Sequence, residues 1–80
     1  GYLTLSSKKP DLWSIQTIND LIEQESDDFK LRRFDKMENL LEALFLVTLS
    51  DPQAIENIDQ ELRTKDSSIQ IIFANTGESF

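Results

Sequence analysis

The stretch that decides the fold is Leu-Leu-Glu-Ala-Leu-Phe-Leu-Val-Thr-Leu, residues 40–49. Two interpretations compete for it. Met37, Leu40 and Leu44 fit the apolar stripe of a helix, whereas the odd positions from 41 to 49 are all apolar, as in a strand covered on one face. Leucine and alanine favour a helix, and the aromatic and β-branched residues near the end favour a strand, so propensity does not decide. The neighbouring segments have to decide.

Three elements are predicted before this stretch. Residues 2–7 alternate as a strand does and run into Ser-Ser-Lys-Lys-Pro at 6–10, which is typical of a turn. Asp11 is a suitable N-cap, and an apolar stripe at three- and four-residue steps predicts a helix over residues 11–25. The segment Phe-Lys-Leu-Arg at 29–32 then alternates apolar with basic residues, which indicates a half-buried strand.

A helix and a strand are predicted after it. Ser-Asp-Pro at 50–52 is a strong helix start, and an apolar stripe continues the helix over residues 52–65. Residues 69–74, Ile-Gln-Ile-Ile-Phe-Ala, are rich in β-branched side chains and are followed by Asn-Thr-Gly. This pattern predicts a final strand.

The first and last strands both need neighbours, because an isolated two-stranded ribbon is marginal in water. A strand at residues 40–49 supplies them, with Asn39 in the hairpin turn before it. The order βαββαβ then predicts a ferredoxin-like α+β fold, a four-stranded antiparallel sheet with two helices on one face and the first and third strands central. The alternative, three helices with an isolated pair of terminal strands, stays open on the sequence alone.

Composition excludes several classes of function. The 80 residues suffice for a single domain, 1–80, and 15 acidic against 8 basic residues give a net charge of -7, so nucleic acid is not an expected partner. The absence of His and Cys removes Ser-His triads, thiol chemistry and nearly all zinc sites. We therefore expect no enzymatic activity, no cofactor and no metal. The longest apolar run is interrupted by Glu42 and is about half a membrane span long, so we expect no membrane insertion by this chain.

Two charged groupings are expected to be solvated surface. The acidic residues at the end of the first predicted helix have neither the spacing nor the glycine of a calcium loop; they are Glu23, Glu25, Asp27 and Asp28. The basic residues of the second predicted strand suit an exposed sheet edge that deters pairing with another strand; they are Lys30, Arg32, Arg33 and Lys36.

The candidate site is an apolar surface of the predicted sheet. If the odd positions of residues 41–49 face the helices, four large side chains face the other way, namely Tyr2, Leu44, Leu46 and Ile72. Such a cluster predicts a homodimer or docking on a parent protein. The alternative is that a loop or residues 76–80 cover it. Trp13 is expected to be a core or rim anchor rather than a residue that stacks on a ligand.

The predicted order, with Tyr-Leu-Thr-Leu at 2–5, Phe-Lys-Leu-Arg at 29–32 and Glu-Ala-Leu-Phe-Leu-Val-Thr-Leu at 42–49, resembles the ACT-like cytoplasmic C-terminal domain of MgtC/SapB-type and related bacterial membrane proteins. The resemblance implies a regulatory accessory domain in the cytoplasm, tethered to the inner membrane through the rest of its parent protein. Because the chain starts with Gly1 rather than Met, we expect an excised domain.

ACT domains elsewhere bind small ligands, which gives an alternative function. A sensor for an amino acid, a nucleotide or an ion would hold its ligand near the first strand-helix connection, at Ser6, Ser7, Lys8 and Asp11. This connection lacks the glycine that lets backbone approach an amino-acid ligand in ligand-binding ACT domains. An assembly domain is therefore the first prediction and a ligand sensor the second.

Overall fold

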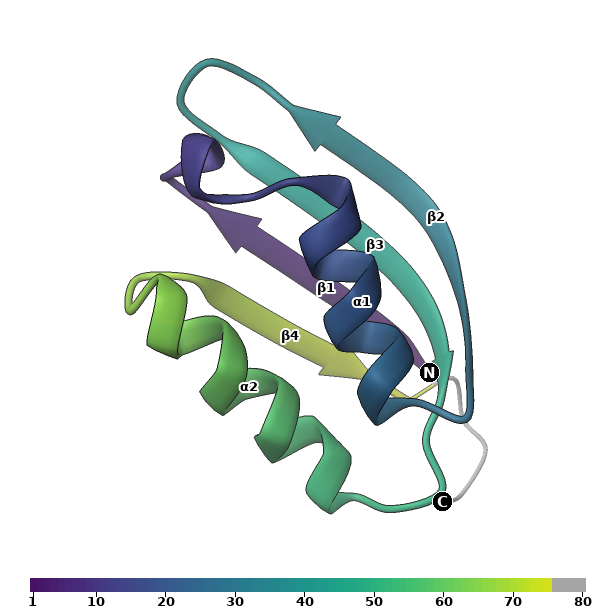
Figure 1. Cartoon of the computed structure of the whole chain (residues 1–80). Coiled ribbons are helices and arrows are strands. Elements are labelled where there is room, and N and C mark those ends of the chain that lie inside the picture. Colours follow the sequence, from purple (N-terminus) through teal and green to yellow (C-terminus); the bar gives the residue numbers. More distant parts are fainter. Residues whose placement is uncertain (76–80) are drawn as a thin grey trace.

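The computed structural model describes residues 1–75 of the chain (Figure 1). These residues form the strands β1 (Tyr2–Ser7), β2 (Asp28–Lys36), β3 (Leu41–Thr48) and β4 (Gln70–Ala74). The helices are α1 (Ile15–Glu25) and α2 (Gln53–Lys65), and a short 3₁₀-helix, η1 (Pro10–Leu12), precedes α1. The order βαββαβ confirms the predicted ferredoxin-like α+β fold. Since residues 41–48 are a strand, the three-helix alternative is wrong.

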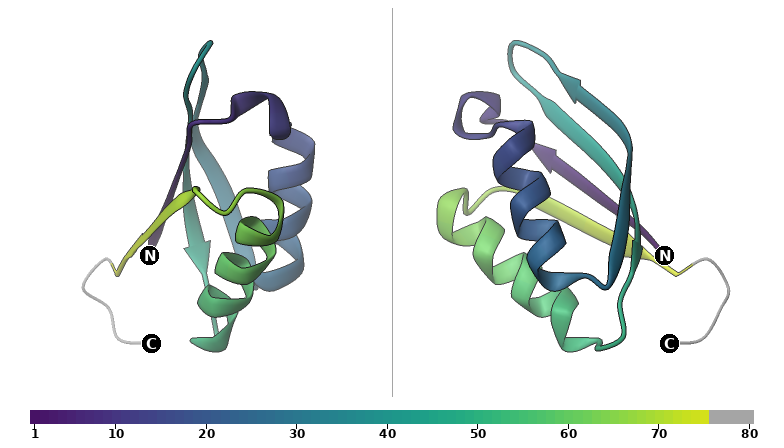
Figure 2. Two further views of the ribbon diagram at one scale, coloured as in Figure 1. Left: turned by 90° about the vertical axis from the view of Figure 1, so that its left-hand side faces the viewer. Right: turned by 45° about the vertical axis from the view of Figure 1, so that its right-hand side comes forward.

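The sheet has the order β2-β3-β1-β4, and each pair of neighbours is antiparallel. The central strands are β1 and β3, as predicted. Both helices lie on one side of the sheet, as the edge-on view in the left panel of Figure 2 shows. Within residues 1–75 no helix or strand covers the other side, which we call the open face.

Alternation along the central strands builds the core. Every odd residue of β1 and β3 is buried against the helices, with Leu5, Leu41 and Phe45 fully inaccessible. The helices contribute buried apolar side chains one turn apart, namely Ile18, Ile22, Ile58 and Leu62. The two interlocking periods, two for strands and about 3.6 for helices, explain why this sequence buries one face of the sheet only.

The start of α1 differs from the prediction. Asp11 is not its N-cap but lies in η1, and the chain becomes extended at Trp13 before α1 begins at Ile15. Ser14 is the N-cap, because its Oγ accepts a hydrogen bond from the Thr17 backbone N–H at 3.1 Å. Pro10 at the first position of η1 suits a short 3₁₀ turn, and the extended backbone of Trp13 and Ser14 separates η1 from α1.

The edge strand β2 is longer than predicted and contains a β-bulge. Leu31 pairs with Phe45 and Arg33 pairs with Leu44, which leaves Arg32 as an extra residue without a partner. The extra residue changes the alternation, so that Phe34 faces the helices together with Phe29 and Leu31. Lys30 and Arg32 are exposed and Phe29 and Leu31 are partly buried, as predicted, and the bulge changes the alternation only after Arg32.

The connections use local hydrogen bonds. In the hairpin turn the Met37 N–H donates to the Leu40 carbonyl at 2.7 Å, so Asn39 lies in the turn, as predicted. At the start of α2, Asp51 Oδ1 accepts from the Gln53 N–H at 2.9 Å. This helix begins one residue later than predicted, and it ends where the Asp66 N–H donates to the Leu62 carbonyl at 2.9 Å.

Candidate functional site

The open face is organised in rows that cross all four strands. One row contains Lys30, Leu46, Tyr2 and Ala74 in the order of the strands. The next contains Arg33, Leu44, Thr4 and Ile72, and a third contains Asp35, Glu42, Ser6 and Gln70. The four residues that the sequence predicts for an interface therefore share one face and lie in two adjacent rows.

Exposure differs strongly among these four residues. Ile72 is 62% exposed and Tyr2 is 40% exposed, while Leu44 and Leu46 on the central strand β3 are partly buried by their neighbours. The odd positions of β3 are all buried, so the same strand separates a sealed face from an accessible one. The result is an apolar centre on a sheet face that the described helices do not cover.

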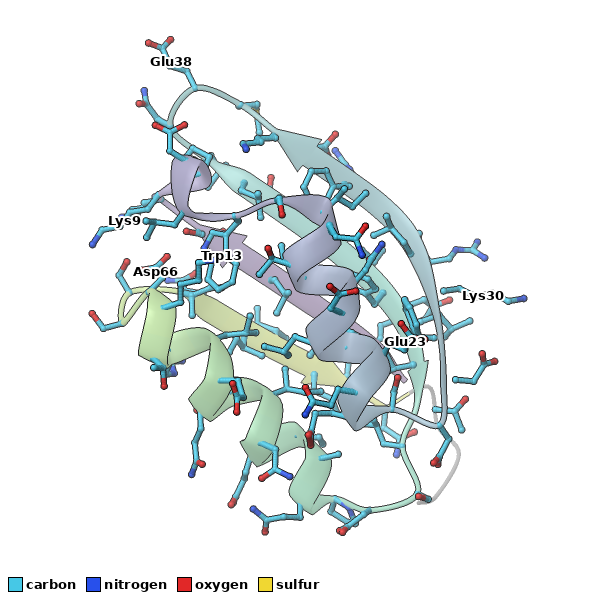
Figure 3. All side chains as sticks on the ribbon, in the orientation of Figure 1. Lys9, Trp13, Glu23, Lys30, Glu38 and Asp66 are labelled. Atoms are coloured by element: carbon cyan, nitrogen blue, oxygen red, sulfur yellow. The ribbon has the colours of Figure 1, made fainter. Side chains whose placement is uncertain are left out.

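Charges frame this apolar centre on the β2 side. At the solvent-exposed surface, Arg33 Nε donates a hydrogen bond to Asp35 Oδ2. This bond raises the pKa of Arg33 above its ordinary value. The pair contributes little to stability because both groups are solvent-facing and screened. Lys30 extends away from β2 into solvent (Figure 3). The prediction of solvated basic residues on an edge strand agrees with the position of β2 in the sheet.

A shallow hollow of about 130 Å³ opens on the same face. Its walls come from three strands, with Thr4 from β1, Arg33 from β2, and Glu42, Ala43 and Leu44 from β3. This hollow was not predicted, because a regular alternation does not reveal the bulge that places Arg33 in the row of Leu44. The one available signal was the change from odd to even apolar positions between Leu31 and Phe34.

The candidate ligand loop is used differently from the prediction of a ligand sensor. Ser7 is 1% exposed, and its Oγ donates to Asp66 Oδ2 at 2.5 Å and accepts from the Lys9 N–H at 3.0 Å. Ser6 is partly buried on the open face, while Lys8 and Asp11 are exposed. Ser6 and Ser7 therefore lie on opposite faces of the sheet, and the hydroxyl of Ser7 is already engaged within the fold.

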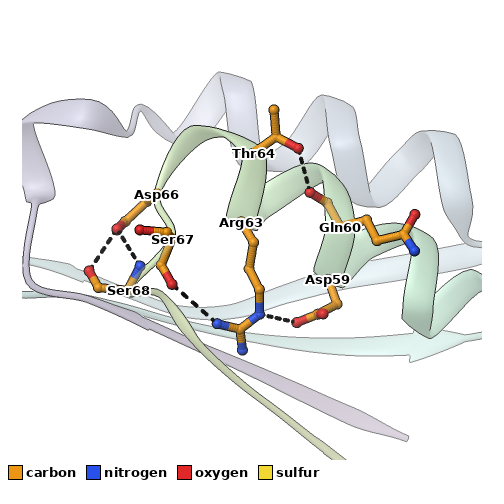
Figure 4. A network of polar contacts seen from close by, with 7 residues as sticks. All are labelled: Asp59, Gln60, Arg63, Thr64, Asp66, Ser67 and Ser68. Atoms are coloured by element: carbon orange, nitrogen blue, oxygen red, sulfur yellow. Dashed lines mark hydrogen bonds and ion pairs between the residues drawn. The ribbon is translucent and has the colours of Figure 1, made fainter.

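Asp66, which was not among the predicted site residues, is a buried carboxylate that accepts several hydrogen bonds. Ser68 provides two of them, its N–H at 3.1 Å and its Oγ at 2.7 Å (Figure 4), and Ser7 provides the third. Burial alone would raise the pKa of Asp66, but the hydrogen bonds from Ser7 and Ser68 outweigh it and lower the pKa from 3.8 to about 2. The signal for it was Asp-Ser-Ser after a helix, a sequence suited to side-chain hydrogen bonds with the following backbone.

Trp13 packs beside this carboxylate (Figure 3) and is 2% exposed, in agreement with its prediction as an anchor. Its indole N–H adds to the lowering of the Asp66 pKa, although Nε1 makes no hydrogen bond of normal geometry with the described residues. Lys65 Nζ lies 5.2 Å from the ring centroid, and Lys36 Nζ donates to the Trp13 carbonyl at 2.9 Å. Trp13 thus joins the η1 segment to the end of α2 and to the edge strand.

Of the predicted acidic grouping, Glu23 and Glu25 lie in the last turn of α1 and Asp27 and Asp28 follow the helix. Across residues 1–75 there is no group of three acidic side chains placed to hold a metal ion. Glu25 instead accepts a hydrogen bond at 3.0 Å from Asn57 Nδ2 on α2.

Neither of the two helices reaches the length and apolarity that crossing a bilayer requires, as judged over the part of the chain that is described.

Comparison with known proteins adds information on the fold only. No protein-family model matches this chain. No curated protein matches it either. Among solved structures it is similar to the de novo designed protein Foldit4, with a TM-score of 0.52 and 16% sequence identity over 92% of this chain and 94% of that one. At this identity the likeness supports the ferredoxin-like architecture and carries no information about a site.

Proposed function

We propose that this chain is a non-catalytic regulatory or assembly domain that acts by protein–protein contact through its open sheet face. The contact is self-association or docking on a parent protein. The observation that carries the proposal is the shared, uncovered face of Tyr2, Leu44, Leu46 and Ile72 within residues 1–75. Monomeric proteins seldom keep several large apolar side chains together on one exposed surface without a function for them.

The magnitude of burial favours a contact of this kind. Covering a large apolar side chain contributes about 1.5 to 3 kcal/mol when the side chain starts fully exposed, and correspondingly less for Leu44 and Leu46, which start partly buried. The edge strand β2 is less suited to pair with another strand, because it contains a bulge and carries exposed basic residues. A partner that removes the open face from water therefore has the larger driving force.

The resemblance to MgtC/SapB-type domains adds the biological setting to this proposal. If the domain is attached to a bacterial membrane protein on the cytoplasmic side, association of two domains brings their attached modules together. Changes in the association of the domains then change the spacing of those modules. The regulatory role depends on the association and needs no bound ligand.

Sedimentation velocity over a wide concentration range tests the proposal. We expect the wild-type chain to associate reversibly and Leu46→Glu to remain monomeric, because the new carboxylate lies in the apolar centre of the open face. Leu12→Glu is the matched control, since Leu12 is an exposed leucine in η1, away from this face. A wild type that is monomeric at every concentration, or a Leu46→Glu variant that associates like the wild type, would contradict self-association.

A thermal-shift screen with amino acids, nucleotides and divalent ions separates the ligand sensor from the assembly domain. A ligand that binds the folded state raises the melting temperature. The assembly proposal predicts no such rise. A rise that Asp11→Ala abolishes would favour the sensor, because Asp11 is an exposed member of the candidate ligand loop.

A further inference from the structure

Ile72 and the hollow lie in the same row on opposite sides of the open face. The row runs Arg33, Leu44, Thr4, Ile72, and Ile72 on the edge strand β4 is the most exposed large apolar side chain of residues 1–75. The hollow is lined by the other three residues of the row and lies toward β2. One face thus carries both a projection and a depression.

The two features match in size. The hollow of about 130 Å³ is close to the ~150 Å³ cavity that truncation of a buried leucine-sized side chain leaves in a protein core. Part of its wall is Arg33, whose side chain is 71% exposed and whose guanidinium pairs with Asp35. The hollow is therefore large enough for an isoleucine side chain.

In a symmetric dimer, Ile72 of each copy can enter the hollow of the other only if the two-fold axis brings them opposite each other. A two-fold axis that lies in the interface parallel to the strands, between β1 and β3, reverses the strand order and keeps the height along the strands. It places β4 of one copy over β2 of the other, and β3 over β1. Aligned sheets cross at about 30°, which shifts the edge strands by about one residue and keeps Ile72 over the hollow of its partner.

We propose that two copies of this chain pack open face to open face about such an axis, with Ile72 of each copy seated in the hollow between Arg33 and Leu44 of the other. This inference rests on the proposed function and names its partner, a second copy. Leu46 of one copy then contacts Tyr2 of the other, since the two residues are paired neighbours in one row. The apolar residues form the centre of the interface, and the charges of β2 form its rim.

The charge of the open face is close to balanced, which is compatible with contact between copies. By register, the open face holds two basic residues, Lys30 and Arg33, against three acidic residues, Asp28, Asp35 and Glu42. The whole chain has 15 acidic and 8 basic residues, so the excess negative charge lies mainly elsewhere. The charges of the open face therefore nearly cancel and add little repulsion when two copies meet there.

The area predicts a weak, reversible dimer. Four strands at about 4.8 Å spacing and about 20 Å length give each face a footprint of roughly 400 Å². The two faces together therefore bury somewhat more than about 800 Å², because side chains make each face uneven and enlarge its surface. This area is at the lower end of specific interfaces. A dimer of this size dissociates on dilution, so its population must depend on concentration.

Two isoleucine variants test the use of this face. We expect Ile72→Asp to abolish the concentration-dependent dimer in sedimentation velocity and Ile15→Asp to leave it unchanged. Ile15 is the control because it is 43% exposed on α1, in the helical layer. Circular dichroism establishes that both variants are folded. A dimer that survives Ile72→Asp, or that is lost only in Ile15→Asp, overturns the inference.

Cysteine pairs test the geometry, and the chain has no native cysteine to interfere. Single variants Ile72→Cys and Arg33→Cys, carrying different affinity tags, are mixed and treated with a thiol crosslinker shorter than the sheet separation of about 10 Å. We expect Ile72–Arg33 products and only background Ile72–Ile72 products. Gln24→Cys on α1 provides the background rate, since Gln24 is exposed in the helical layer.

The outcomes separate the two proposals. Predominant Ile72–Ile72 products would indicate an axis perpendicular to the strands or a pairing of two β4 edges, so the proposed geometry would be wrong while self-association stands. A monomeric wild type at every concentration would contradict self-association and, with it, this geometry, so that docking on a parent protein would be the contact left to the proposed function.

Discussion

Ser7 and Asp66, which are 59 residues apart in the sequence, are joined by a 2.5 Å hydrogen bond between two buried side chains. The bond connects the end of β1 to the turn between α2 and β4, so it joins the two halves of the fold. Because the donors lower the pKa of Asp66 to about 2, the carboxylate is ionised under ordinary conditions although it is buried.

The first prediction concerns the pH dependence of stability. Since the folded state lowers the pKa of Asp66 from 3.8 to about 2, its stabilising contribution is complete above about pH 4 and is lost as the pH falls toward 2. The shift corresponds to about 2 kcal/mol. Urea denaturation at a series of pH values should show this loss in the wild type and a flatter profile in Asp66→Asn. Asp59→Asn is the control, because Asp59 forms an exposed ion pair with Arg63, and its profile should follow that of the wild type.

The second prediction concerns the β-bulge. Deleting one of the two arginines at 32 and 33 removes the extra residue, leaves every remaining pair with β3 in place and should hardly change the midpoint of denaturation. Deleting Lys30 instead removes the same charge and length but moves Phe29 or Leu31 to the open face. That should lower the free energy of unfolding by about 2 kcal/mol or more. Equal losses in the two deletion variants would argue against the bulge.

The third prediction compares the two faces of β3. Leu41→Ala should lower the free energy of unfolding by about 2 to 5 kcal/mol, because Leu41 is fully buried and the truncation leaves a cavity. Leu44→Ala in the same strand should cost the monomer clearly less, since Leu44 is partly exposed. Chemical denaturation at low protein concentration measures both values without a contribution from association. A larger loss for Leu44→Ala would mean that the strand faces the opposite way.

The fourth prediction concerns the start of α1. Ser14→Ala should lower the free energy of unfolding by about 1 kcal/mol, because Ser14 accepts the Thr17 N–H at the N-cap. Asp11→Ala should change it by less than about 0.5 kcal/mol, since Asp11 is exposed in η1 rather than at the cap. Thermal denaturation of both variants, monitored by circular dichroism, distinguishes the two positions. If Asp11→Ala lowered the free energy of unfolding more than Ser14→Ala, Asp11 would be the N-cap, as the sequence predicted.

Local patterns were sufficient to predict most of the fold. The apolar odd face of β3 could be identified because side chains of a strand alternate between its two faces. The need of β1 and β4 for neighbours then decided between strand and helix. The same alternation placed Tyr2, Leu44, Leu46 and Ile72 on one face. These predictions needed only the period of the side chains and the connection rules.

The features that could not be predicted depend on contacts between distant segments. Aspartate is usually exposed, and Asp66 can be buried because Ser7 and Ser68 donate hydrogen bonds to its carboxylate oxygens. The hollow beside Arg33 depends on an extra residue in β2, whose position is fixed by pairing with β3. The first depends on a contact between residues 59 positions apart and the second on the register between two strands, and neither can be read from a single sequence.

The pairing of Tyr2 with Ala74 across β1 and β4 has a consequence for how such a domain can be joined to others. The polypeptide enters the sheet at Tyr2 and leaves it at Ala74 on adjacent antiparallel strands, so entry and exit lie side by side at one corner (Figure 1). Flanking segments on both sides would therefore start from nearly the same point. A fold with this connection can be inserted into a host polypeptide with little separation of the host's two ends.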